Sequence, residues 1–133
     1  MENAHLKISV RMAFIMGIFL PLAETTRRIN QISDLKEFFS WFDDYILGLI
    51  LLIAAYRALK ERPNSISYLI AAWGICSGAL FLSFIGQFNY FETTTGDPGI
   101  FSTTFVAVAK GGILLFMLFG LWKSIKANEL HRA

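Results

Sequence analysis

Three charged residues occur at or inside strongly apolar stretches of this sequence, and their spacing places them at one depth. Glu24 follows a basic residue by thirteen positions, and Asp44 and Lys110 each precede one by the same interval. The basic residues that set this spacing are Arg11, Arg57 and Lys123. With a rise of about 1.5 Å per residue, each charge lies roughly 20 Å along a helix from its basic residue. We therefore expect Glu24, Asp44 and Lys110 to share one charged layer.

A charge in an apolar environment is costly unless it has a partner, so this layer favours ion pairing or ligand binding. The simplest pairing joins Lys110 to Glu24 or Asp44, or shares it between them. Glu24 can also meet Arg27 or Arg28 along its own helix, at i+3 and i+4. Two carboxylates around one ammonium leave a surplus negative charge, which suits a proton, a metal ion or an organic cation. The residues expected to rim the layer on its outer side are Asp43, Arg27, Arg28 and Gln87.

Other kinds of site lack the residues that they need. His5 and His131 lie at opposite ends of the chain, so neither is expected to reach the layer to serve a haem, a zinc ion or a catalytic triad. No glycine-rich nucleotide-binding loop is present. We therefore expect no cofactor and favour a non-enzymatic role over catalysis. The sequence leaves open whether the acidic residues hold a metal ion.

The composition that surrounds these charges is typical of an integral membrane protein. Hydrophobic residues make up 55% of the 133 positions, charged residues only 17%, and the mean hydropathy is +0.52. A water-soluble domain of this size would need more polar surface to cover its core. The formal net charge of +2 also gives no footprint for nucleic acid, which is excluded as a partner.

Four apolar segments are predicted to cross the membrane as helices, at about residues 8–30, 43–60, 66–88 and 98–124. Only the last two approach the ~20 apolar residues that a span needs, so the first two depend on charged ends that lie in or reach out of the membrane. Short loops predict one domain over 1–133, an all-α antiparallel four-helix bundle. Alternatively, the first segment is a cleavable signal peptide, which would leave three spans.

Basic residues predict the orientation of these spans. Eight of the twelve lysines and arginines lie around the start of the first segment, between the second and third, or after the fourth. The positive-inside rule then puts both termini in the cytoplasm, and the expected location is the bacterial inner membrane. The charged layer would lie in the outer half of the bilayer.

The connection between the first two spans is predicted to form a short amphipathic helix on the outer membrane surface, over about residues 33–42. Its apolar residues recur at helical spacing: Ile32, Leu35, Phe38, Phe39 and Phe42. Such a helix anchors the start of the second span or, alternatively, covers an outward-facing site. Before the fourth span, Asp97 is predicted to be the helix cap and Pro98 the first helical residue.

Small residues predict where helices approach closely. Gly74 and Gly78 form a GxxxG pattern in the third span, and Gly112 lies in the fourth. We predict that these glycines bring the two spans together within one chain or, alternatively, across a homodimer.

The function that these residues favour is an outward-accessible pocket within the membrane, which binds or transports a small cation, a proton or a polar solute. The expected partners are the lipid bilayer, that solute and further copies of the chain, since four short spans enclose little volume alone. The alternative is a non-catalytic interaction or accessory subunit, whose buried ion pairs only specify assembly.

Overall fold

The computed structural model describes residues 3–133, and all regular elements in this range are helical. They are α1 (Ala4–Arg27), α2 (Phe38–Trp41), α3 (Asp43–Leu59), α4 (Ser65–Gln87), the 3₁₀ helix η1 (Phe88–Phe91) and α5 (Thr103–Arg132). Four helical stretches are long and apolar enough to cross a membrane: α1, α2 with α3, α4 with η1, and α5. The prediction of an all-helical chain with four such helices is confirmed.

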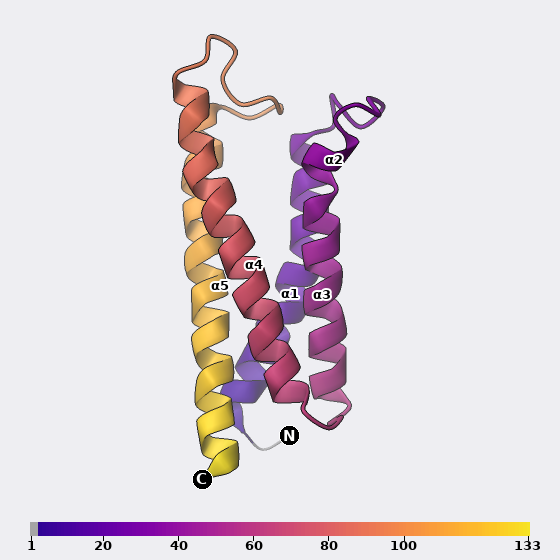
Figure 1. The fold of residues 1–133 in the computed structure, drawn as a ribbon, viewed down its shortest axis with the longest axis vertical. Coiled ribbons are helices and arrows are strands. Elements are labelled where there is room, and N and C mark those ends of the chain that lie inside the picture. The colour runs from indigo at the N-terminus through magenta and orange to yellow at the C-terminus, as the bar shows by residue number, and fades with distance from the viewer. Residues whose placement is uncertain (1–2) are drawn as a thin grey trace.

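The long helices form two pairs, α1 with α3 and α4 with α5 (Figure 1). The pairs meet through contacts of α1 with α5 and of α3 with α4. They lie close together at the end that holds both termini and diverge toward the other end (Figure 1). We call the first the tight end and the second, which carries the connections 28–42 and 88–102, the open end.

The tight end closes around a fully buried tryptophan of α4. Trp73 Nε1 donates a hydrogen bond of 2.8 Å to Ser9 Oγ on α1. Ser9 Oγ lies 2.6 Å from Ser124 Oγ and donates at 3.1 Å to the carbonyl oxygen of Gly120, both on α5. A Cβ at position 120 would lie 2.5 Å from the indole, so only glycine lets α5 come this close. Three helices are thereby fixed to one another at this level.

The α1–α3 contact also depends on glycine. A Cβ at Gly17 would lie 2.9 Å from the carbonyl oxygen of Gly48, and one at Gly48 would lie 2.6 Å from that of Gly17. In contrast, a Cβ at any of the predicted packing glycines would meet nothing within 4 Å: Gly74, Gly78 and Gly112. This corrects the prediction that those three bring α4 and α5 together, because α4 turns its Trp73 face into the bundle instead. The homodimer alternative stays a prediction.

Two helix starts differ from the predicted ones. The helix expected over 33–42 is reduced to α2. Before it, the Asp34 side chain accepts a hydrogen bond of 3.0 Å from Lys36 N, and this bond favours a turn over a helix in the residues that lead into α2. The cap of α5 is Ser102, whose Oγ accepts from Phe105 N at 3.2 Å. Asp97 does not cap α5, because its carboxylate is engaged elsewhere.

Candidate functional site

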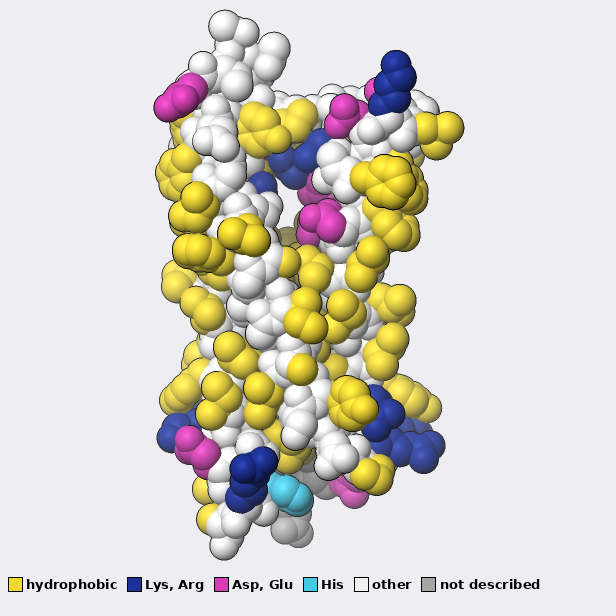
Figure 2. Space-filling model, in the orientation of Figure 1, with side chains coloured by type: hydrophobic (Ala, Val, Ile, Leu, Met, Phe, Trp, Pro, Cys, Tyr) yellow, Lys and Arg dark blue, Asp and Glu magenta, His cyan; other side chains and the backbone are white. Residues whose placement is uncertain are grey.

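A cavity of about 770 Å³ lies between the two helix pairs near the open end. Its wall includes all seven residues that the sequence predicts for a polar site: Glu24, Arg27, Arg28, Asp43, Asp44, Gln87 and Lys110. Figure 2 shows a window between the two columns of side chains at this level, with acidic and basic side chains around it. Residues from four helices, distant in the sequence, therefore share one space.

Helical spacing on α1 explains the first ion pairs of the site. Glu24, Arg27 and Arg28 stand at i, i+3 and i+4, so their side chains share one face of the helix. Glu24 Oε2 lies 3.0 Å from Arg27 Nη1, and Glu24 Oε1 lies 3.0 Å from Arg28 Nε. The predicted contact of Glu24 with Arg27 or Arg28 is confirmed, and Glu24 in fact pairs with both.

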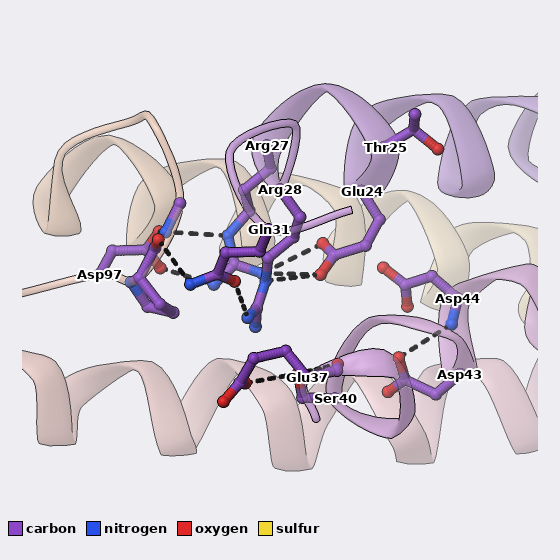
Figure 3. A network of polar contacts seen from close by, with 12 residues as sticks. Glu24, Thr25, Arg27, Arg28, Gln31, Glu37, Ser40, Asp43, Asp44 and Asp97 are labelled. Carbon is purple, nitrogen blue, oxygen red and sulfur yellow. Dashed lines mark hydrogen bonds and ion pairs between the residues drawn. The ribbon is translucent and has the colours of Figure 1, made fainter. Parts of the chain in front are cut away.

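Arg27 also reaches a carboxylate that the sequence did not assign to the site. Its Nη2 lies 2.6 Å from Asp97 Oδ1, and its Nε donates to Asp97 Oδ2 at 3.3 Å (Figure 3). Gln87 Nε2 donates to the same Asp97 Oδ1 at 3.0 Å. We call Glu24, Arg27, Gln87 and Asp97 the Arg27 clamp. It ties the end of α1 to α4 and to the connection that leads into α5.

Asp97 lies in that connection, outside the helices, and is an ionised member of the clamp. Burial alone would raise the pKa of Asp97, but hydrogen bonds from Arg27, Gln87 and the Gly99 N–H outweigh it and hold the pKa below its ordinary value of 3.8. One sequence signal could have found this role. The connection 88–102 carries acidic residues and no basic ones, opposite the two adjacent arginines at the end of α1.

Lys110 does not make the predicted ion pair with Glu24 or Asp44. Its Nζ donates to Gln87 Oε1 at 2.9 Å and to the carbonyl oxygen of Ser83 at 3.3 Å. The physical reason is that Arg27 and Arg28, at the end of the helix that carries Glu24, already form ion pairs with the Glu24 carboxylate. An ammonium has three N–H donors, so Lys110 keeps one for a further partner.

Asp44 is the acidic residue of the cavity that stays without a donor. Within residues 3–133, its carboxylate accepts no hydrogen bond and forms no ion pair, although its backbone N–H donates to Asp43 Oδ1 at 2.9 Å. Figure 3 shows the Asp44 carboxylate directed into the gap between α1 and α3, whereas the Glu24 carboxylate is directed toward Arg27 and Arg28. Because Glu24 is already paired with two arginines, Asp44 is the carboxylate that remains available to a cationic group.

The cavity therefore combines a free carboxylate on α3, an ammonium with spare donor capacity on α5 and apolar walls. Its volume lies within the roughly 300–1,000 Å³ typical of small-molecule sites. No group of three or more His, Cys, Asp or Glu side chains in the described part of the chain is placed to hold a metal ion. Compared with known proteins, the chain matches no family model, no curated protein and no solved structure.

Proposed function

We propose that this protein is an antiparallel four-helix membrane bundle that binds a small polar organic molecule with a cationic group in the cavity at its open end. The observation that carries the proposal is the Asp44 carboxylate, which lines the cavity without a hydrogen-bond donor. An unpaired charge among apolar groups is costly, and a cationic ligand group supplies its partner. The cavity is also far larger than a bare ion needs, which favours an organic solute over a proton or metal ion.

The proposed orientation puts the open end outside and the tight end in the cytoplasm of a bacterial inner membrane. It is supported by the basic residues, which gather around the termini and the turn between α3 and α4. Cysteine labelling tests it with Thr94→Cys and Lys60→Cys in a Cys76→Ala background. A membrane-impermeant maleimide added to spheroplasts should label the first position and not the second, and the reverse result would invert the proposal.

Binding is tested by thermal unfolding of the purified full chain in detergent, with ethanolamine as the cationic probe. We expect millimolar ethanolamine to raise the unfolding midpoint of the wild type and to leave that of Asp44→Asn unchanged. Asp34→Asn is the matched control, because Asp34 is exposed and does not line the cavity. An equal response of the wild type and Asp44→Asn, or no response in either, would refute the proposed site.

The Arg27 clamp favours a second candidate, an accessory subunit whose ion pairs serve assembly alone. Its carboxylates are paired with arginines, and it joins three separate segments of the chain. A charge swap separates the two candidates. The double variant Asp44→Lys with Lys110→Asp leaves the clamp intact, so it should assemble under either candidate. Loss of ethanolamine binding in this variant supports the ligand site, whereas an accessory role predicts that the wild type does not bind ethanolamine either.

A further inference from the structure

At the open end of the bundle, a connection bridges the cavity on the side that faces water in the proposed orientation. The connection 92–102 extends from the α4–α5 pair across the gap to α1 (Figure 1). There, Ile100 N donates at 2.9 Å to the carbonyl oxygen of Arg27, and Gln31 Nε2 donates at 3.1 Å to that of Pro98. Together with the Arg27 clamp, these bonds hold a strap over the end of the gap. Direct access from the aqueous phase is therefore restricted.

The sides of the cavity, in contrast, reach the apolar surface of the bundle. Its wall includes Phe19 and Leu22 of α1 and Phe105 of α5, which are 44%, 61% and 56% exposed. In Figure 2 the window lies below the connections, at a level where hydrophobic side chains cover the neighbouring surface. These exposed groups belong to helices proposed to span the membrane, so lipid chains would surround the opening.

The two charges with spare capacity define the polar part of a ligand. Asp44 has a free carboxylate on α3, and Lys110 has one N–H left on α5. Both line the same cavity, so a group that carries one positive and one negative charge would satisfy both at once. A headgroup with only one charge would satisfy either the Asp44 carboxylate or the remaining Lys110 N–H, but not both.

We propose that the cavity takes a phospholipid with a zwitterionic phosphate–amine headgroup, which enters sideways from the outer leaflet between the helix pairs. The inference rests on the proposed function and names the ligand class of that site. The amine pairs with Asp44, the phosphate accepts from Lys110, and the acyl chains lie along the exposed side chains of α1 and α5. The strap above the cavity keeps the headgroup from leaving directly into water.

The test compares three probes on the purified full chain in detergent by thermal unfolding and by native mass spectrometry. They are dihexanoyl phosphatidylethanolamine, the phosphatidylglycerol with the same chains, and free phosphoethanolamine. We expect the zwitterionic lipid to bind at least tenfold more tightly than either of the others. Tight binding of free phosphoethanolamine, equal to that of the lipid, would overturn lateral loading while leaving the proposed function intact. Failure of all three probes, together with failure of ethanolamine, would overturn both.

A cavity-filling variant tests the location of the lipid. Gly86 lines the cavity, and a Cβ there would meet nothing within 4 Å, so Gly86→Phe adds a ring that begins in open space at the cavity wall. We expect it to weaken lipid binding at least tenfold. Gly78→Phe is the matched control, since Gly78 lies on the same helix, also faces open space and does not line the cavity. Equal lipid binding by the two variants would contradict the inference.

Headgroup selection gives a second readout that does not depend on Gly86→Phe folding. Asp44→Asn removes the partner of the amine, so the preference for phosphatidylethanolamine over phosphatidylglycerol should fall at least tenfold. Lys110→Met removes the partner of the phosphate and should weaken both lipids together. Unchanged preference in Asp44→Asn would place the headgroup elsewhere and overturn the assignment.

Discussion

The tight end and the open end of the bundle both bury polar side chains, but they do so with different chemistry. At the tight end, the hydroxyls of Ser9 and Ser124 and the indole of Trp73 are neutral and hydrogen-bonded to one another or to a helix carbonyl. At the open end, Glu24, Arg27 and Asp97 are charged, and neutral Gln87 links Asp97 to Lys110. At the tight end, serine and glycine let the helices touch around one indole, whereas at the open end long charged side chains bridge helices that stand apart.

This difference separates the parts of the open end that hold it together from those that remain available. The Arg27 clamp replaces the helix contacts that the diverging pairs lack, so it serves stability. Asp44 and Lys110 line the same cavity, yet they make no ion pair with each other. We therefore expect that, at the open end, substitution of a charged clamp residue lowers stability far more than substitution of Asp44.

The largest loss of stability is expected from Arg27→Met, because this substitution removes the ion pair with Asp97 that joins the two helix pairs at the open end. The change leaves Asp97, whose side chain is fully buried, without its cationic partner. Removing one member of a buried pair typically costs about 3–5 kcal/mol. The free energy of unfolding in detergent micelles should fall by this amount. Arg28→Met is the control and should lose much less, because Glu24 keeps Arg27; equal losses would refute the clamp.

At the tight end, Gly120→Ala should have the next largest effect. The added methyl would overlap the Trp73 indole, so the helices must shift. Overpacking of this kind typically costs about 1–3 kcal/mol in the free energy of unfolding. Gly112→Ala on the same helix meets open space and should be neutral or slightly stabilising in the same unfolding measurement. A large loss in Gly112→Ala would mean that a surface outside this chain covers that face.

The sequence predicted the residues of the cavity better than their pairing. A helix has a fixed rise, so equal intervals from the basic residues placed Glu24, Asp44 and Lys110 at one level. The choice of partners depends on the connection 92–102, whose path follows no periodicity, and so Asp97 was assigned to a helix cap. Equally, GxxxG spacing identifies a helix face of small residues, but it does not determine whether that face packs into the bundle. The bulk of Trp73 decided that rotation.

Acidification should weaken the clamp in a defined direction. Because the folded pKa of Asp97 lies below its ordinary value of 3.8, ionised Asp97 stabilises the fold fully above that value. This contribution is lost as the pH falls below 3.8 through the lower folded pKa. The measurement is the difference in unfolding free energy between the wild type and Asp97→Asn from pH 7 to pH 3, which should shrink only at the acid end. A constant difference would show that folding does not lower the pKa of Asp97 and that the clamp does not favour its ionised form.

Asp44→Asn is expected to have the smallest effect on stability, and it best distinguishes the residues that bind a ligand from those that stabilise the open end. The substitution removes a carboxylate that accepts no hydrogen bond within residues 3–133, so the free energy of unfolding should stay within about 0.5 kcal/mol or rise. The same variant should lose ethanolamine binding, which separates function from stability at one position. A loss as large as that of Arg27→Met would instead make Asp44 part of the clamp. In that case the open end, like the tight end, would use its polar groups only for packing, and the accessory role would be the better account.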